Sequence, residues 1–351
     1  MTVALATPIS KRESNTSLAN STYGPVPGES DLYNNYTLKD PPFPADYTAA
    51  ILPTANGPPG PDDLLFQNLL SAEWAIYSLY QQAVEAFNVS SFAELGLSQT
   101  TYSRVASIRD NEAGHLRIFQ DSISPSSVKP GPCSYDYGFT TAEEWLALQV
   151  TIEISSMAFL TGLVRGAELA ATRSALVAIA EVESRHNAWA LLDVWKTDPF
   201  AGPSDTVFPY ANQILDATNR FIVPGSCPRE NPVYPLPRQN LPRLEVAATT
   251  GEGGAVVQPG EEVRFVFSDA SNQPDWYWQQ ADRDYYAVFF HGVDNITRPF
   301  DVKTNTSRIP AEFDAARGMI LAVIANEVGA PTEDSVVAGP AFIIEQPQLS
   351  N

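Results

Sequence analysis

The sequence predicts an α+β protein, in which a four-helix bundle with one long crossover precedes an antiparallel β-sandwich. Three observations predict this order. Apolar residues recur at helical spacing over residues 62–222, a proline-rich stretch follows, and short apolar runs separated by Gly, Pro, Asn and Asp fill the remainder. The 351 residues suit two domains of ordinary size, and hydrophobic residues, at 44%, are sufficient for a sizeable core.

The composition of the chain limits the kinds of partner that it can bind. Asp and Glu outnumber Lys and Arg by 41 to 21, which gives a net charge of -20. A chain this acidic is unsuited to nucleic-acid binding by phosphate neutralisation, and anionic lipid repels it. No stretch reaches the roughly 18 apolar residues of a membrane span. We therefore expect neither a nucleic-acid nor a membrane partner.

Residues 1–60 are rich in Ser, Asn, Thr, Pro and Gly and lack any period, which is typical of a disordered leader. The start lacks a clear apolar signal core but ends in the dibasic pair Lys11–Arg12. We interpret it as the remainder of a secretory leader; the alternative is an uncleaved cytoplasmic N-terminus. Secretion would allow Cys133 and Cys227 to pair, and otherwise they are two buried thiols. Sequons for N-glycosylation begin at Asn15, Asn20, Asn35, Asn88, Asn295 and Asn305.

Residues 61–223 carry the helical pattern. The predicted helices start at Asp62–Asp63, after Ser98, at the capping box Thr140–Glu143 and after Arg173, and a shorter helix spans 209–222. The connection between the second and third helices has about sixteen residues and reaches roughly 50 Å when extended. It can therefore cross a bundle of helices about 40 Å long. Two hairpins joined by such a crossover are predicted.

Residues 224–243 hold six prolines without any period, so we predict a linker. Residues 244–346 follow as an immunoglobulin-like β-sandwich, judged by size and strand spacing. The candidate strands are 244–248, 263–268, 285–291, 319–326 and 341–345. The run Trp276–Trp278 is interpreted as aromatic packing, or else as a surface that stacks on carbohydrate or contacts a partner. A cell-wall or glycan partner of this domain is therefore a hypothesis.

Two of the three histidines, His115 and His186, lie in the motif Glu-x-x-His with Glu112 and Glu183. Spacing of three residues puts both side chains on one helix face. Here that face is apolar, where an unpaired carboxylate and imidazole are costly. Each motif alone is more often a surface pair than a metal site.

The other two long helices each supply one Glu on an apolar face, Glu73 beside Leu70 and Ile76, and Glu153 beside Val150 and Met157. Antiparallel hairpins can bring these residues level with the two motifs. Four carboxylates and two imidazoles then point inward, a set that suits two Fe or Mn ions. The predicted metal ligands are Glu73, Glu112, His115, Glu153, Glu183 and His186.

On these residues and the helix order, residues 62–222 resemble the ferritin-like superfamily. Within it they resemble fungal secreted stress-response and late-sexual-development proteins, and more distantly plant desiccation-related proteins. The resemblance implies that Glu73 and Glu153 are terminal or bridging ligands, that Glu112 and Glu183 bridge, and that each histidine binds one metal. The linker and sandwich depart from classical ferritin, which argues against a closed iron-storage cage.

Three functions remain open, and whether the protein is an enzyme is one of the open points. The first is a secreted redox metalloprotein that oxidises Fe(II) or removes peroxide. The second is a non-enzymatic cell-wall or extracellular stress protein that uses the bundle as a scaffold and the sandwich for partner binding. The third is extracellular metal scavenging.

Three further residues are considered as members of the site. Tyr77 is a core aromatic or a redox group near the metals, and Asp193 is a surface carboxylate or an acceptor near His186. His291 has no assigned function.

Overall fold

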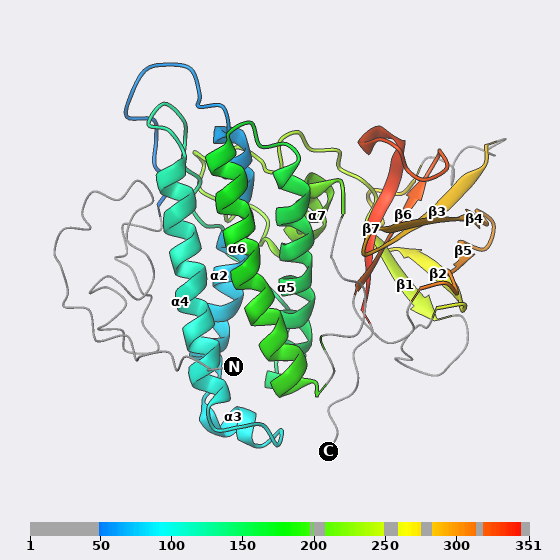
Figure 1. Ribbon diagram of the computed structural model, residues 1–351, viewed down its shortest axis with the longest axis horizontal. Coiled ribbons are helices and arrows are strands. Elements are labelled where there is room, and N and C mark those ends of the chain that lie inside the picture. The colour runs from blue at the N-terminus through cyan, green and yellow to red at the C-terminus, as the bar shows by residue number, and fades with distance from the viewer. Residues whose placement is uncertain are drawn as a thin grey trace, which may run out of the picture.

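The computed structural model describes residues 49–196, 199, 208–248, 259–274, 283–313 and 319–344. Helices come first and strands follow, and Figure 1 shows the long helices side by side with the sheets beyond them. This confirms the predicted α+β fold. The helices are α2 (Asp63–Ala86), α3 (Val89–Ala93), α4 (Thr101–Ser122), α5 (Ala142–Val164), α6 (Ala170–Trp189) and α7 (Ala211–Thr218). A π-helical turn over Ala190–Val194 extends α6.

The segment between α4 and α5 is the long crossover. It runs alongside α2 from one end to the other, because Gln67, Trp74 and Gln82 donate in turn to the carbonyls of Val128, Pro130 and Tyr135. The chain therefore returns to the end at which α4 began before α5 starts. Hairpins α2–α4 and α5–α6 result, as predicted.

A disulfide joins Cys133 in this crossover to Cys227 in the segment after α7. Of the two alternatives left open by the sequence, the structure contains the pair. Within the predicted leader, residues 49–60 contact the crossover, since the backbones of Ile51 and Lys129 hydrogen-bond to each other at 3.0 and 2.9 Å. Residues 1–48 and the run Trp276–Trp278 lie outside the described residues.

Two helix starts differ from the sequence prediction, and the first difference is that the capping box of α5 lies one residue later than Thr140–Glu143. Thr141 accepts from the backbone of Glu144, whose side chain accepts from Thr141 in return, so α5 begins at a capping box. Asp62 does not cap α2 with its side chain. Its carboxylate instead accepts from the backbone N–H groups of Glu168 and Leu169, at 2.8 and 3.1 Å, just before α6. The side chain of Asp62 thus links the start of α2 to the start of α6 through hydrogen bonds.

Helix α5 corrects one expectation from the sequence. By length and composition it is apolar enough to cross a membrane, with a mean hydropathy of 1.5 over the best window. Scattered polar residues such as Glu153 interrupt the apolar run without lowering this mean far, so no continuous stretch is visible in the sequence. Inside the protein 67% of that window is buried, and the core helix of a bundle passes the same test.

In the described part of the chain, seven strands form two antiparallel sheets, of order β1-β2-β5 and β4-β3-β6-β7. Leu244, Phe265 and Phe289 belong to an apolar cluster that the two sheets enclose. The strands are β1 (Leu244–Ala248), β2 (Glu262–Phe267), β3 (Tyr285–His291), β4 (Asp294–Phe300), β5 (Thr306–Arg308), β6 (Met319–Ala325) and β7 (Val336–Ile344). Alternating residues of the strands therefore build a second core, separate from that of the helices.

Strands β4 and β5 are absent from the sequence prediction. β4 contains Pro299 and many polar side chains, which weaken a strand pattern, but it lies at the edge of its sheet, where a missing N–H is tolerated. It pairs with β3 through a tight hairpin in which His291 lies opposite Asp294. β5 has three residues, too few for any period.

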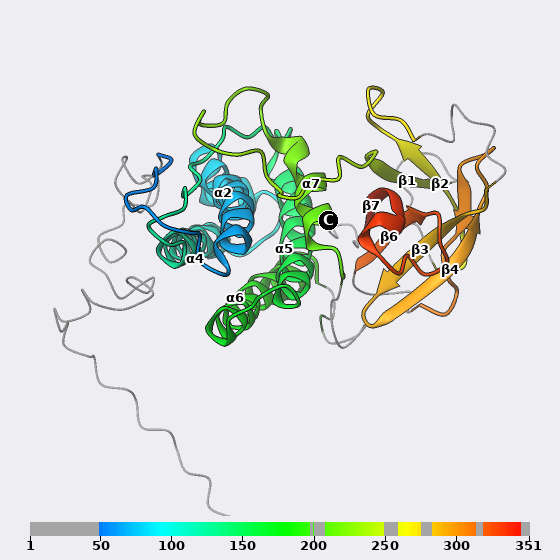
Figure 2. The same ribbon diagram turned by 90° about the horizontal axis from the view of Figure 1, so that it is seen from above.

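The four-stranded sheet also packs against the helices. All seven residues of β6 are buried, because one face lies in the sandwich core and the other contributes to the core of the helical domain. Phe208 packs edge-to-face on Phe290, with 5.1 Å between ring centroids. Figure 2 shows α7 between α5 and the sheets. The two domains therefore share one apolar layer.

Candidate metal centre

Each of the four long helices contributes to one buried polar cluster. Glu73 comes from α2, Glu153 from α5, and the two Glu-x-x-His motifs come from α4 and α6. Every one of the six residues is at most 5% exposed. The hairpins have brought the two single carboxylates level with the motifs, so the residues singled out in the sequence lie together.

The imidazole of His115 faces three carboxylates through one atom. Its Nδ1 lies 3.0 Å from Oε2 of Glu112, 3.1 Å from Oε1 of Glu73 and 3.3 Å from Oε1 of Glu183. These oxygens come from three different helices. A nitrogen with three carboxylate oxygens around it is the donor set of one half of the cluster.

The imidazole of His186 repeats this arrangement. Its Nδ1 lies 3.0 Å from Oε1 of Glu112, 3.5 Å from Oε2 of Glu183 and 3.6 Å from Oε2 of Glu153. Glu153 here takes the place that Glu73 has beside His115. The two halves are therefore related by exchanging α2 and α4 for α5 and α6.

Glu112 and Glu183 link the two halves. Glu112 turns Oε2 to His115 and Oε1 to His186, and Glu183 turns Oε1 to His115 and Oε2 to His186. Glu73 and Glu153 each contact a single histidine. Two shared and two unshared carboxylates, with one imidazole at each end, match the ligand pattern of carboxylate-bridged dimetal bundles.

The hydrogen-bond inventory shows why a cation fits. An imidazole has at most one proton on Nδ1, so it cannot satisfy three oxygens. Both oxygens of Glu183, and one each of Glu112 and Glu153, are buried without a hydrogen-bond partner, as is Nδ1 of His186. Such orphaned atoms are rare and costly in a protein interior. The ligand atoms of each half lie within 4.8 Å of one another, close enough for a single ion.

Electrostatics divides the four carboxylates into two pairs. Burial and the neighbouring Glu112 raise the pKa of Glu73 well above its usual value, and burial and Glu183 do the same to the pKa of Glu153. Burial also opposes ionisation of the shared pair, but contacts with both histidines lower the pKa of Glu112 and of Glu183. Glu73 and Glu153 therefore keep their protons to a higher pH than Glu112 and Glu183 do.

The histidines are held in their protonated form when no cation is bound. Burial alone would lower their pKa values, but Glu112, Glu183 and Glu73 raise the pKa of His115 well above its usual value. Glu153 and Glu112 do the same to the pKa of His186. Two imidazolium groups then balance two ionised carboxylates. A cation entering the cluster must displace protons.

Tyr80 belongs to the centre, and sequence reasoning missed it. Its hydroxyl donates to Oε1 of Glu153 and accepts from Nε2 of Gln149 at 2.8 Å. Burial and Glu153 raise the pKa of Tyr80 well above its usual value, so the group remains a donor. Its position seven residues after Glu73, two helical turns along the same face, is a signal that could have found it.

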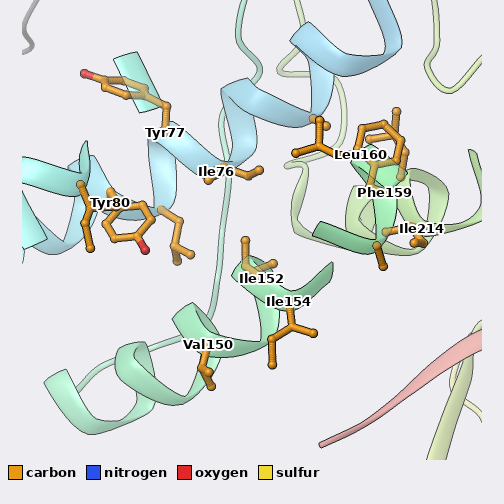
Figure 3. Packing of buried hydrophobic residues seen from close by; sticks show 14 of the residues in the cluster. Ile76, Tyr77, Tyr80, Val150, Ile152, Ile154, Phe159, Leu160 and Ile214 are labelled. Carbon is orange, nitrogen blue, oxygen red and sulfur yellow. The ribbon is translucent and has the colours of Figure 1, made fainter. Parts of the chain in front are cut away.

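Tyr77, considered in its place, lies in the core. Its hydroxyl donates to Gln81 at 3.3 Å, and its ring packs edge-to-face on Trp74. Figure 3 shows the rings of Tyr77 and Tyr80 leaving α2 in different directions. Of the two alternatives for Tyr77, the structure supports the core aromatic.

The two other residues considered do not join the cluster. Asp193 lies on the π-helical turn after α6 and is exposed. His291 is buried on β3, where Nδ1 lies 3.2 Å from the carbonyl of Met319 and the ring packs on Phe313. Its environment is that of a core histidine in the sandwich.

Comparison with known proteins agrees with this geometry. Residues 62–192 match the family described as ferritin-like domain. A search of curated proteins finds no matching sequence. The matched segment begins next to α2 and ends beyond α6, so it contains all six residues of the buried cluster. Residues 62–192 are thus similar to a ferritin-like domain, and the buried carboxylate and histidine cluster within them is compatible with a dinuclear metal site.

Proposed function

We propose that the helical domain holds two Fe or Mn ions and performs redox chemistry on a small oxidant, either by oxidising Fe(II) or by removing peroxide. One observation carries this proposal: Glu112 and Glu183 each offer one oxygen to each histidine. A single ion needs only one half of this set. The doubled, shared arrangement suits a pair of ions with hard oxygen and imidazole ligands.

The metals, when bound, would supply Lewis acidity and electron transfer. The chain would hold them through Glu73 and His115 on one side, Glu153 and His186 on the other, and the two shared carboxylates between. Tyr80 orients Glu153 by fixing Oε1, which leaves Oε2 turned to the centre. Because every ligand is nearly inaccessible, the helices also exclude bulk water from the site.

The setting that we propose is extracellular. Disulfides persist in oxidising compartments, and the Cys133–Cys227 pair supports such a location. The sequons at Asn88 and Asn295 are exposed, so both can accept a glycan. The resemblance to fungal secreted stress-response and late-sexual-development proteins supports the same setting and a role in stress or development. A glycan or cell-wall partner would be bound by the C-terminal sheets.

A non-enzymatic role is the second candidate, and one observation favours it. The cluster can balance its own charge, since Glu112 and Glu183, whose pKa values are lowered, contact His115 and His186, whose pKa values are raised. The bundle can therefore stand without metal as a scaffold. In that case the C-terminal sheets would carry the function by binding a partner.

Metal loading followed by a reaction assay tests the proposal. The protein is loaded anaerobically with Fe(II) or Mn(II), and consumption of oxygen and of peroxide is followed beside a Glu112→Ala/His115→Ala variant. The proposal expects turnover that needs the metal and disappears in the variant. Loaded protein that consumes neither oxidant would contradict the redox role and favour the scaffold.

The control variant is Arg264→Gln/Arg308→Gln, with both changes at exposed positions of the C-terminal sheets. It should turn over like the unmodified protein. Circular dichroism of each variant shows whether the helices persist.

A further inference from the structure

A pocket of about 350 Å³ opens between α4 and α6, two neighbouring long helices of the bundle in Figure 1. Arg104 and Ile108 line it from α4, and Arg185 and Trp189 line it from α6. His186 lines it as well, so the pocket reaches a residue of the buried cluster. Nothing in the proposed chemistry uses this space.

The ring of His186 has one edge in the centre and one edge without a protein partner. Nδ1 is buried among Glu112, Glu153 and Glu183, whereas Nε2 has no hydrogen bond to any described residue. An imidazole that binds a cation through Nδ1 carries its proton on Nε2. Histidines in metal sites almost always donate this second N–H to a carboxylate, a carbonyl or water. The α4–α6 pocket is where such an acceptor can lie.

The charge of the pocket is unusual for this chain. Arg104 and Arg185 are exposed, and neither side chain forms an ion pair or hydrogen bond with the residues that the structure describes. Asp193 is an acidic member of the same lining, which leaves one positive charge in excess. The whole chain has a net charge of -20. A local positive excess on an acidic protein attracts anions and repels free Fe(II).

The remaining wall is apolar and aromatic. Trp189 is half-buried on α6, and Ile108 is buried on α4. An indole face gives a ligand a flat apolar surface. The lining therefore combines two guanidinium groups, which suit a carboxylate, with a surface for a short hydrocarbon part.

We propose that the α4–α6 pocket binds a small organic carboxylate. Its anionic group pairs with Arg104 and Arg185 and accepts from Nε2 of His186, and its apolar part lies on Trp189 and Ile108. As the assignment of a substrate or effector class, this inference rests on the proposed dimetal function. Binding itself does not, because α4, α6 and the π-helical turn after α6 form the pocket.

Hexanoate is the probe, and 1-hexanol is its neutral control. Binding of each to the full-length protein is measured by titration calorimetry, without metal and after loading. Hexanoate should bind and 1-hexanol should not. Arg104→Gln/Arg185→Gln should weaken hexanoate binding about tenfold or more, because hydrogen bonds to charged groups are lost. Arg264→Gln/Arg308→Gln removes the same charge from the C-terminal sheets and should bind hexanoate unchanged.

Fluorescence quenching locates the binding. The contribution of Trp189 is isolated as the difference between the unmodified protein and Trp189→Phe. Iodide should quench this contribution several-fold more efficiently than caesium, and hexanoate should protect it. Equal binding of hexanoate and 1-hexanol, or equal losses in the two arginine pairs, would overturn the proposal. Metal content, measured separately, decides the dimetal proposal, so the two can fail independently.

Discussion

Nδ1 of His186 on α6 lies 3.0 Å from Oε1 of Glu112 on α4, although Glu112 belongs to the Glu-x-x-His motif of His115. Glu183 makes the reverse connection, since Oε1 lies 3.3 Å from Nδ1 of His115. The carboxylate of each motif therefore contacts the histidine of the other motif as well as the histidine of its own motif. This exchange makes a single centre of two motifs that lie on different helices.

Removing the hydroxyl of Tyr80 should weaken metal binding without unfolding the protein. In Tyr80→Phe, Glu153 loses the donor that fixes Oε1 and can turn away from the centre. Loss of such an outer partner usually costs roughly 10–100-fold in metal affinity. Competition with a chelator measures that affinity. Tyr77→Phe is the matched control, because the Tyr77 hydroxyl contacts Gln81 and should leave the affinity unchanged. Equal effects of the two variants would contradict the assignment of Tyr80.

The stability of the metal-free protein should fall as the pH rises above neutrality. His115 and His186 have a raised pKa in the folded state, so their stabilisation is complete below the unfolded value of about 6.5 and is lost above it. Glu73 and Glu153 also have a raised pKa and keep protons that the unfolded chain has released, which acts in the same direction. Bound metal displaces these protons and should flatten the dependence.

Thermal melting between about pH 6.5 and pH 9 checks this linkage. The Tm of metal-free protein should fall over this range, and that of the loaded protein should change less. Glu73→Gln/Glu153→Gln cannot lose the two carboxyl protons and should melt with a shallower dependence. Parallel curves for loaded and metal-free protein would show that the cluster does not exchange protons for metal.

Asp62 should contribute about 1–3 kcal/mol to the free energy of unfolding, because its carboxylate accepts part-buried hydrogen bonds from two backbone N–H groups before α6. In Asp62→Asn one oxygen becomes an amide donor and faces an N–H. The side chain of Thr172 and the backbone of Glu168 and Leu169, working against burial, lower the pKa of Asp62. Its contribution is therefore present above the unfolded value of about 3.9 and lost as the pH falls through the folded value.

Urea denaturation at neutral and acidic pH measures this contribution. The difference between Asp62→Asn and the unmodified protein should shrink at acidic pH. Glu94→Gln alters an exposed carboxylate and should be neutral at both. A difference that does not depend on pH would contradict the role of the ionised carboxylate.

Breaking the Cys133–Cys227 disulfide should cost about 3–5 kcal/mol, because it closes a loop with a sequence separation of 94 residues. It should leave the metal stoichiometry unchanged, since neither cysteine belongs to the cluster. Denaturation and metal content of Cys133→Ser/Cys227→Ser measure both effects. Metal loss at unchanged fold would show that the crossover holds the centre in place.

The sequence predicts the bundle well because its signals are local. Capping at Thr141, helical spacing around Glu73 and the two Glu-x-x-His motifs depend on neighbours within a few turns. The side chains at Asp62 and Tyr80 act on residues far along the chain, at Leu169 and Glu153. Their partners are fixed by packing of helices, which no local period describes.

The strands likewise divide into those that the local sequence predicts and those that it does not. β3 and β6 are visible because they are apolar on both faces, whereas β4 carries polar residues and Pro299. That β6 is buried on its second face by the helical domain is a fact of tertiary structure. The exchange of Glu112 and Glu183 between the two histidines likewise follows from helix packing, even though all four residues are recognisable in the sequence.

Metal content per chain tests the central claim most directly. Protein purified without chelator or nickel is loaded anaerobically with Fe(II) or Mn(II), freed of excess metal and analysed by mass spectrometry beside Glu112→Ala/His115→Ala. The shared carboxylates predict about two ions per chain, both lost in the variant because it disrupts both halves. No retained metal in either protein, or equal amounts in both, would contradict a dinuclear centre at these residues.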